Sequence, residues 1–350
     1  MKNLIKIPRD ADLPLIGAIM FGIIDRGTNL LQVRPTSVCN LNCIFCSTDA
    51  GPFSKTRIND YEVELDYLID WFKEVARYKE NKHLIAFIDS VGDPLTYPEI
   101  VDLVQELSEI EGVENVGIET NGTLFNEELI EELKEVGLTQ VNISIHALDK
   151  ELARKLSGVE FYNVEKVLKI AEFISNKGIE LILTPIWIPG MNDEEIGKIV
   201  EFSRRINKNK KLPPLGVQKY QVHKYGRKVK GVKEIRWYYF YKKLEEWEKK
   251  FNYKLKIGPR DFKIFKFKPL PKPFKRGNKI KVEIECEGWM KNELIGKSKD
   301  RCVTVLNSKG KRGDLINVKI LRDKDNLYLA NPIRKKFIEI DKIKDLERLF

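Results

Sequence analysis

Cysteine and histidine are scarce in this sequence, and long apolar runs are missing. The 350 residues include 5 cysteines and 3 histidines. So few cysteines exclude a disulfide framework and fit a reducing compartment, so we expect a cytoplasmic protein. The apolar run over residues 13–24 is interrupted by Gly17 and Gly22 and is too short to cross a bilayer. Arg9, Asp10 and Asp12 precede this run and argue against a signal peptide, so we expect no membrane partner.

Charges of opposite sign balance over most of the chain. The sequence has 62 Lys and Arg against 52 Asp and Glu, a formal net charge of +10. Residues 262–330 contain 18 basic and 8 acidic residues, so this segment accounts for the whole excess. A localised basic excess is typical of a protein that binds a polyanion, and a solvated basic surface is the alternative.

Three of the cysteines, Cys39, Cys43 and Cys46, have the spacing C-x3-C-x2-C. Thiolates are soft ligands that suit zinc and iron–sulfur clusters. A structural zinc site closes with four ligands, and the next candidate along the chain is the distant His83. Three local thiolates instead suit a cubane cluster with one iron left open to another molecule. A zinc site completed by a distant histidine remains the alternative.

Apolar periodicity predicts an α/β fold in which strands and helices alternate. The expected strands are 30–34, 84–88, 113–118, 140–145, 179–188 and 215–221. The expected helices are 61–79, capped by Asp60, then 97–110, 126–136, 164–177, 193–206 and 233–251. Right-handed crossovers would curl such a sheet into a partial (β/α)6 TIM-like barrel with its site at the carboxyl ends of the strands. Polar or glycine-bearing segments follow every predicted strand, whereas the opposite loops are short and plain.

The cysteine loop and the strand ends that follow it resemble the radical S-adenosylmethionine (SAM) enzymes over roughly residues 28–225. In that family three such thiolates hold a [4Fe-4S] cluster, whose open iron binds SAM and which an external donor such as ferredoxin or flavodoxin reduces. The resemblance implies that Cys39, Cys43 and Cys46 are the cluster ligands. The residues that it places near SAM are Phe45, Gly92, Asp93, Pro94, Thr120, Asn121, Ser144, Ile188 and Pro189. Val91 and Asp93 replace the first glycine and the glutamate of the family's Gly-Gly-Glu-Pro loop.

Some members of this family carry further clusters or cysteine-rich extensions, for which this chain lacks the cysteines. We therefore expect one cluster, and we expect Cys286 and Cys302 to be buried as small apolar side chains. No general acid or base is assigned. The candidates for substrate contact are His146, Tyr220, Gln221 and His223, because they lie at the ends of predicted strands. A hydrogen-bonded loop side chain is the alternative for His146.

The C-terminal part predicts a second, smaller domain. Pro269, Pro271 and Pro273 favour an extended linker. Short strands at 279–285, 302–306, 315–322 and 327–330 predict a small OB-like β-barrel. The segments 274–277, 288–290, 303–305 and 317–320 resemble the TRAM domain, a small RNA-binding barrel of tRNA- and rRNA-modifying enzymes. This resemblance makes RNA the expected partner, through Lys275, Arg276, Trp289, Lys291, Lys311 and Arg312. Trp289 or Phe274 would stack on bases, with core packing as the alternative for Trp289.

The expected organisation follows from these segments. It comprises an N-terminal arm (1–28), a radical SAM core (29–258), a linker (259–273), a TRAM-like RNA-binding barrel (274–332) and a C-terminal extension (333–350). The combination resembles archaeal-type Fe-S oxidoreductases. The sequence thus predicts a radical SAM enzyme with one cluster that modifies RNA, tRNA in particular. Two alternatives stay open: radical SAM modification of a protein or small molecule, and a non-catalytic RNA-binding protein with a structural metal site.

Overall fold

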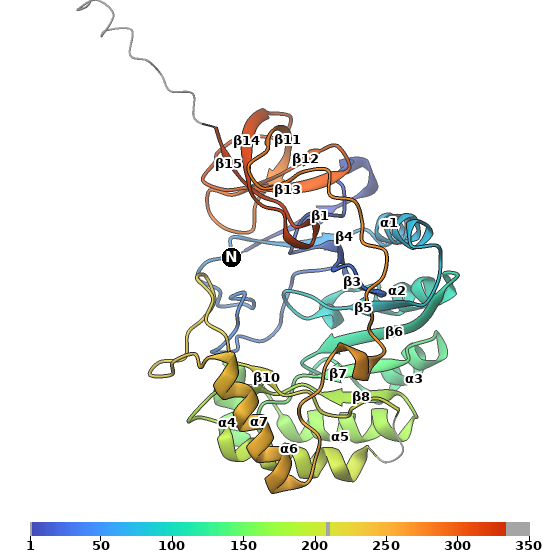
Figure 1. The fold of residues 1–350 in the computed structure, drawn as a ribbon, viewed down its shortest axis with the longest axis vertical. Helices are drawn as coiled ribbons and strands as arrows, with labels where there is room; N and C mark the ends of the chain where they lie inside the picture. The colour runs from blue at the N-terminus through green and yellow to red at the C-terminus, as the bar shows by residue number, and fades with distance from the viewer. Residues whose placement is uncertain (1, 208–210, 334–350) are drawn as a thin grey trace, which may run out of the picture.

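The computed structural model describes residues 2–207 and 211–333, so most of the expected C-terminal extension lies outside the described residues. A small β-barrel lies at one end of the molecule and a curved sheet in the middle (Figure 1). Helices lie along the outside of the curve (Figure 1). Within the described residues, no helix is long and apolar enough to cross a membrane.

The central sheet has six strands. They are β2 (Gly22–Asp25), β3 (Leu30–Arg34), β5 (Leu84–Ile88), β6 (Val113–Thr120), β7 (Gln140–Ile143) and β8 (Glu180–Leu183), in that order. β2 runs antiparallel to β3, and the other neighbours are parallel. A short parallel pair, β9 (Ile186–Trp187) and β10 (Gln218–Lys219), continues the curve. The expected partial TIM-like barrel is therefore confirmed, with a sixth unit reduced to two paired residues.

Seven α-helices accompany the strands within the described residues. They are α1 (Leu65–Tyr78), α2 (Ile100–Glu109), α3 (Glu127–Glu135), α4 (Lys150–Ser157), α5 (Val164–Asn176), α6 (Asp193–Ile206) and α7 (Trp237–Phe251). α6 has its predicted bounds, and Asn126 caps α3 by accepting a hydrogen bond from the Leu129 amide at 2.8 Å. α4 was not predicted. Short 3-10 turns occur at η1 (Arg9–Ala11), η2 (Pro94–Thr96), η3 (Pro259–Phe262) and η4 (Lys324–Asn326).

The predicted helix start at Asp60 is wrong. Residues 59–63 form strand β4 (Asn59–Val63), which pairs in parallel with β1 (Asn3–Ile7), and α1 begins only at Leu65. The Asp60 carboxylate accepts hydrogen bonds from Lys2 and Arg57 rather than from a helix amide. A ladder with a strand more than fifty residues away outweighs the local signal for a cap.

The first 28 residues are not a free arm. Besides β1 and β2 they contain a buried stretch around Leu15, Gly17 and Phe21 that lies against the small barrel. The Ile16 carbonyl accepts a hydrogen bond from the Cys302 amide at 2.8 Å, and the Gly17 carbonyl accepts one from the Tyr328 amide at 3.0 Å. A Cβ at Gly17 would lie 2.0 Å from the Cys302 carbonyl oxygen, and φ there is +132°. Only glycine fits this contact.

The C-terminal strands close into a barrel of five. They are β11 (Lys279–Glu287), β12 (Leu294–Ser298), β13 (Arg301–Val305), β14 (Leu315–Arg322) and β15 (Leu329–Pro332). β12 was not predicted. Cys302 is buried in β13 and Cys286 is half-buried in β11, as small apolar side chains would be. Phe274 packs on Tyr328 inside this barrel and is only 4% exposed, so the expectation that it stacks on bases is wrong.

Candidate active site

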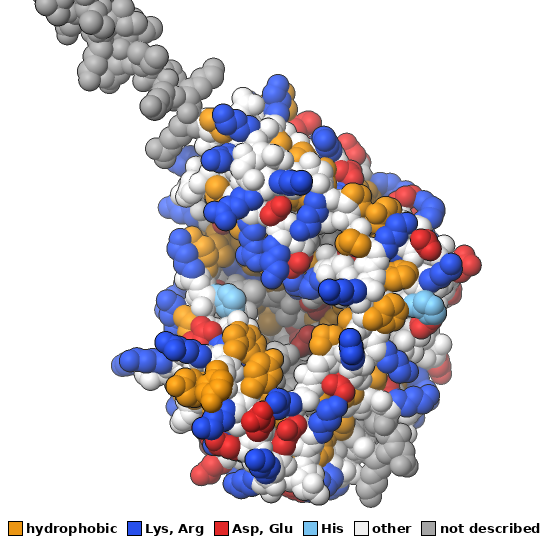
Figure 2. Space-filling model, in the orientation of Figure 1, with side chains coloured by type: hydrophobic (Ala, Val, Ile, Leu, Met, Phe, Trp, Pro, Cys, Tyr) orange, Lys and Arg blue, Asp and Glu red, His pale blue; other side chains and the backbone are white. Residues whose placement is uncertain are grey.

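A cavity of about 970 Å³ lies between the carboxyl ends of the strands and the small barrel. One wall carries the cysteine loop and the loops after β5, β6 and β7, and another carries barrel residues that include Trp289, Lys291 and Arg322. Lys and Arg side chains flank the hollow in the space-filling view (Figure 2). The cavity is thus shared between the core and the barrel.

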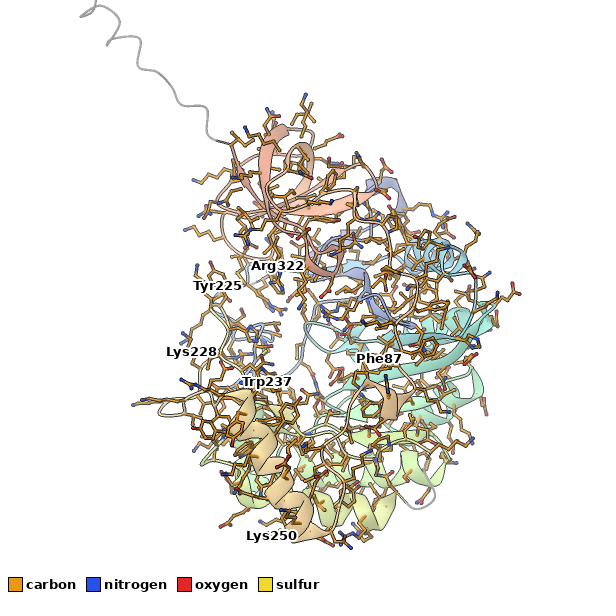
Figure 3. All side chains as sticks on the ribbon, viewed as in Figure 1. Phe87, Tyr225, Lys228, Trp237, Lys250 and Arg322 are labelled. Carbon is orange, nitrogen blue, oxygen red and sulfur yellow. The ribbon has the colours of Figure 1, made fainter. Side chains whose placement is uncertain are left out.

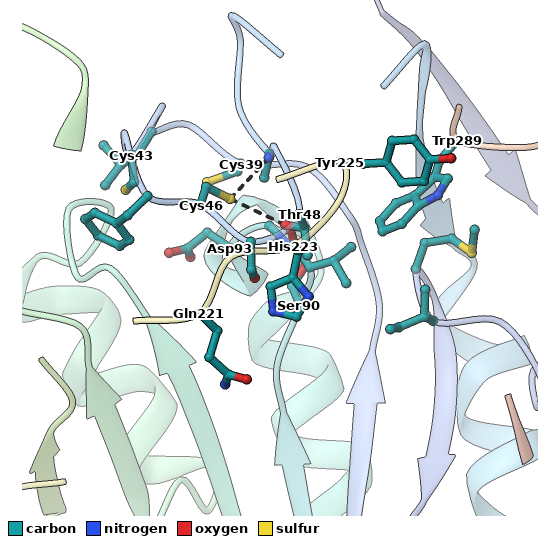
Figure 4. Close-up of a pocket in the computed structure, with 18 of the residues that line it drawn as sticks. Cys39, Cys43, Cys46, Thr48, Ser90, Asp93, Gln221, His223, Tyr225 and Trp289 are labelled. Atoms are coloured by element: carbon teal, nitrogen blue, oxygen red, sulfur yellow. Dashed lines mark hydrogen bonds between the residues drawn. The ribbon is translucent and has the colours of Figure 1, made fainter. Parts of the chain in front are cut away.

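The three cysteines lie together on this wall. Cys39, Cys43 and Cys46 follow β3, are free and half-buried, and line the cavity (Figure 4). The C-terminal end of α4 holds the loop, because the carbonyls of Ser157 and Leu156 accept hydrogen bonds from the amides of Asn42 and Ile44 at 3.0 and 3.1 Å. The unpredicted helix therefore positions the predicted cysteines.

The three thiols differ in acidity. Burial raises the pKa of Cys39 to about 12, with the nearby Asp93 carboxylate adding to the effect, and burial also raises the pKa of Cys43 strongly. Burial opposes ionisation at Cys46 too, but hydrogen bonds from Thr48 and Ala50 prevail and lower its pKa. The Ala50 amide lies 3.3 Å from the Cys46 Sγ. Cys46 is therefore the thiol best prepared to be a thiolate ligand.

The donor set fits an iron–sulfur cluster. Three free thiols, those of Cys39, Cys43 and Cys46, lie together on the cavity wall. In a cubane cluster each cysteine binds a different iron, so three thiolates would hold three irons and leave the fourth open. Burial raises the pKa values of Cys39 and Cys43, and the positive charges of Arg57 and Arg227 partly oppose this rise. The same charge would offset that of a thiolate cluster.

The loop after β5 packs tightly on the backbone that leads into the cysteine loop. A Cβ at Gly92 would lie 2.0 Å from the Val38 carbonyl oxygen, so no side chain fits there. The buried Asp93 carboxylate accepts hydrogen bonds from the Thr120 hydroxyl at 2.9 Å and the Asn121 amide at 2.7 Å. Burial nevertheless raises its pKa. Asp93 thus joins the ends of β5 and β6, and Pro94 begins η2 without lining the cavity.

The other predicted SAM contacts divide into two groups. Phe45, Thr120, Asn121 and Ser144 line the cavity. Asn121 also donates to the Asn40 side chain at 2.9 Å, which links the end of β6 to the cysteine loop. Ile188 and Pro189 are not among the lining residues, and Ile188 is fully buried. The loop after β9 therefore lies behind the wall, contrary to the expectation of direct contact.

The predicted substrate contacts also separate. Gln221 and His223 are exposed on the cavity wall (Figure 4). Tyr220 is 1% exposed and its hydroxyl accepts a hydrogen bond from the Val229 amide at 3.0 Å, so it mainly supports the loop. The His146 Nδ1 accepts a hydrogen bond from the Ile186 amide at 3.1 Å, and burial lowers the pKa of this imidazole to about 4. His146 is therefore neutral at pH 7, with its proton on Nε2, and packs edge-on against Phe45.

The predicted RNA contacts lie on or beside the barrel. Lys275, Arg276, Lys291, Lys311 and Arg312 are exposed, and Lys291 also lines the cavity. Arg312 donates to Glu285 at 3.2 Å. Trp289 is 9% exposed and packs under the Arg57 guanidinium at 4.7 Å, so core packing describes it better than base stacking.

Sequence reasoning missed two polar groups of this site. Burial and the charge of Asp89 raise the pKa of Glu119, which lines the cavity, to about 7. Arg227 donates to the Asn42 side chain and the Ala50 carbonyl, and so holds the cysteine loop from outside. Glu119 lies next to Thr120 at the carboxyl end of β6, and that position is the signal that could have found it. Nothing local to Arg227 indicated its distant partners.

The fold is a curved, partial β/α barrel, and three cysteines line a cavity at the carboxyl ends of its strands. This combination is typical of one class of iron–sulfur enzymes. The profile of the Radical SAM superfamily matches residues 33–203, so this part of the chain is a radical SAM domain. The cofactors of such a domain are a [4Fe-4S] cluster and SAM.

Three similar proteins illustrate the range of relatives. An uncharacterised protein of Methanocaldococcus jannaschii is 44% identical over 339 residues, which cover 91% of this chain and 78% of that protein. A probable GTP 3′,8-cyclase of Sulfurisphaera tokodaii is 26% identical over 209 residues, or 59% of this chain and 62% of the cyclase. The structure of Streptococcus suis SuiB bound to SAM aligns with a TM-score of 0.47 at 18% identity, over 71% of this chain and 51% of SuiB.

Proposed function

We propose that this radical SAM enzyme modifies RNA, tRNA in particular. The observation that carries the proposal is the shared cavity, whose walls include both the cysteine loop and residues of the basic barrel. A polyanion held on the barrel would have its reacting nucleotide beside the thiols. The proposal takes this barrel as OB-like and TRAM-like over residues 274–332, after a radical SAM core (29–258) and a linker (259–273).

In this proposal each part of the cavity wall has a role. Cys39, Cys43 and Cys46 hold the cluster, and Phe45, Gly92, Thr120, Asn121 and Ser144 surround SAM. When bound and reduced, this pair supplies a 5′-deoxyadenosyl radical. Asp93 and Pro94 position the loop after β5, and Ile188 and Pro189 support the wall from behind. Gln221 and His223 face the substrate, while the neutral His146 offers its Nε2 proton as a hydrogen-bond donor.

Basic residues supply the electrostatic part of the proposal. Lys275, Arg276, Lys311 and Arg312 would neutralise phosphates along the barrel, and Lys291 would do so at the cavity. Reduction of the cluster requires an external donor, such as a cytoplasmic ferredoxin or flavodoxin.

The first test concerns the cluster. After anaerobic reconstitution, the wild-type protein should bind iron and sulfide and should release 5′-deoxyadenosine from SAM in the presence of reductant. Cys43→Ala should lose the cluster, whereas Cys302→Ala, a buried barrel cysteine, should keep its iron. Equal iron content and equal SAM cleavage in Cys43→Ala would refute the assigned ligands.

The second test concerns RNA. The affinity for tRNA should fall steeply with salt, because each neutralised phosphate releases a counterion. In the double variant Lys275→Ala/Arg276→Ala, the negative slope of log K against log salt should become shallower by about 1 to 2, because two phosphate contacts are lost. Lys134→Ala, an exposed lysine on α3 far from the barrel, is the matched control. Affinity that is indifferent to salt would refute phosphate contact.

A free nucleotide is a second candidate substrate. The cavity is large for one cofactor, it has Lys224, Lys291 and Arg322 on its wall, and one relative is a probable GTP 3′,8-cyclase. Competition distinguishes the two candidates. GTP at concentrations that saturate the protein should leave tRNA bound if RNA is the substrate, and should displace it if the cavity binds the free nucleotide.

A further inference from the structure

A second basic segment borders the cavity opposite the barrel. Residues 224–243, which we term the aromatic lip, contain 8 Lys and Arg and one acidic residue, Glu234. Glu234 is paired with Lys219, so the lip presents almost only positive charge. The aromatic side chains of the lip that are exposed are Tyr225 (46%), Trp237 (50%), Tyr238 (70%), Tyr239 (57%) and Tyr241 (44%).

Most of these aromatic side chains are not needed to hold α7 in place. The buried face of this helix is made by Phe240, Leu244 and Trp247, which recur at helical spacing. Trp237 borders that face, with its ring centroid 5.7 Å from that of Phe240, whereas Tyr238 and Tyr239 lie on other sides of the helix. Singly exposed apolar residues need no explanation, but a cluster of large ones marks an interaction site.

The rings present flat faces among cations. Trp237 and Tyr241 stack one helical turn apart, with centroids 5.8 Å apart and planes 26° apart. The Lys219 ammonium lies 5.1 Å from the centre of the Trp237 ring, and the Lys224 ammonium lies 4.8 Å from that of Tyr225. This combination of ring faces and positive charge is how proteins hold unpaired nucleic acid.

The lip is tied to the candidate active site. Tyr225 and Lys224 line the cavity, and the Arg227 amide donates to the Cys46 carbonyl at 2.8 Å. Tyr225, Lys228 and Trp237 lie on the open side of the molecule, across from Arg322 of the barrel (Figure 3). A strand of RNA that crosses the opening would touch both basic surfaces.

We infer that the aromatic lip binds an unpaired stretch of RNA by stacking its bases on Tyr238, Tyr239 and the neighbouring rings. The inference rests on the proposed function and narrows its substrate class to single-stranded or looped RNA. A paired helix keeps its base faces inside the stack and offers nothing to these rings. Residues 237–241 span about 6 Å along the helix, at a rise of 1.5 Å per residue. That length is close to two stacking steps of about 3.4 Å each, which join three stacked bases.

The test compares unpaired and paired RNA on the full-length, reconstituted protein. Fluorescence anisotropy would give the affinity for a labelled oligouridylate and for an RNA duplex of the same length. Tyr238→Ala/Tyr239→Ala should weaken oligouridylate binding at least about tenfold and leave duplex binding unchanged, because each stacked base contributes about 1–3 kcal/mol. Tyr238→Phe/Tyr239→Phe keeps the rings and should bind like wild type. Phe161→Ala removes an exposed ring elsewhere and should also have no effect.

The outcomes separate the inference from the proposed function. Suppose that Tyr238→Ala/Tyr239→Ala binds oligouridylate like wild type while Lys275→Ala/Arg276→Ala binds RNA more weakly. This result would refute base stacking on the aromatic lip and would leave RNA as the proposed substrate. If the wild-type protein binds neither RNA, both ideas fail. Equal loss of duplex and oligouridylate binding would also overturn base stacking. A change in sedimentation of the RNA-free protein on removing the two tyrosines would identify the lip as an interface between proteins and overturn the inference.

Discussion

Polar side chains of the candidate site mostly form hydrogen bonds with backbone groups of other loops. Asp93, Tyr220 and His146 each accept a hydrogen bond from a main-chain amide. Sequence placed all three near the chemistry because polar residues follow the strands of a β/α barrel. The sequence could not separate residues that contact a cofactor or substrate from residues that support a loop, because that difference depends on hydrogen-bond partners in other loops. The same limit applies to Trp289, whose partner Arg57 lies on a segment remote in sequence.

The half-buried imidazole of His146 predicts a pH-dependent stability. Its pKa is about 4 in the folded protein, against an ordinary value of 6.5, because burial disfavours the charged form. The unfolded chain takes up the proton first, so the free energy of unfolding should fall as pH drops from about 6.5 to 4. His146→Asn, which can still accept from the Ile186 amide, should remove up to about 3 kcal/mol of that fall. Urea unfolding of both proteins over this pH range measures the difference, and parallel curves would contradict it.

Elements whose signals are local were predicted well, and elements whose partners are distant were not. α6 combines apolar periodicity with acidic residues in its first turn and basic ones in its last, and its bounds were predicted. β4 exists because β1 pairs with it, and the residues of β12 include a glycine and give a weak strand signal. α4 had a readable signal, an Asp149 cap and a Gly158 terminus, which was overlooked.

Because the loop after β5 is closely packed, we expect that one added methyl group at Gly92 lowers the stability of the protein. Gly92→Ala would place its Cβ 2.0 Å from the Val38 oxygen and 2.4 Å from the Ser37 oxygen, so the backbone before Cys39 must move. We expect a loss of roughly 1–3 kcal/mol in stability and poorer retention of iron. Urea midpoints and iron content after gel filtration measure both. Gly258→Ala is the control, since nothing lies within 4 Å of its Cβ, and equal behaviour of the two variants would refute the packing argument.

Over the whole molecule, positive charge gathers in two places. The residues outside 262–330 carry no net charge in sum, yet the aromatic lip within them has 8 basic residues and one acidic. The β-barrel was predicted as a second domain after a linker. It packs on the N-terminal segment and on β4, where the Tyr61 hydroxyl donates to the Glu287 carbonyl at 2.7 Å.

This docking predicts that the barrel and the core unfold together. Wild-type protein should give one calorimetric transition. Gly17→Ala, whose Cβ would meet the Cys302 carbonyl, should displace the barrel and split the transition in two. Gly258→Ala should keep a single transition. An unsplit transition in Gly17→Ala would show that the contact is dispensable.

The residues that line the cavity come from nearly the whole sequence, from Ile19 to Leu329. The cavity is therefore complete only after the C-terminal strands have been synthesised and have folded. During synthesis the cysteine loop leaves the ribosome long before Arg227, Trp289 and Arg322 have been made, because chains fold from the N-terminal side. In that interval the thiols lack the wall that the barrel later provides. Once the last strands dock, residues such as Trp289 and Arg322 stand opposite the cysteine loop. We therefore expect the cluster to enter more readily before the barrel docks than after it.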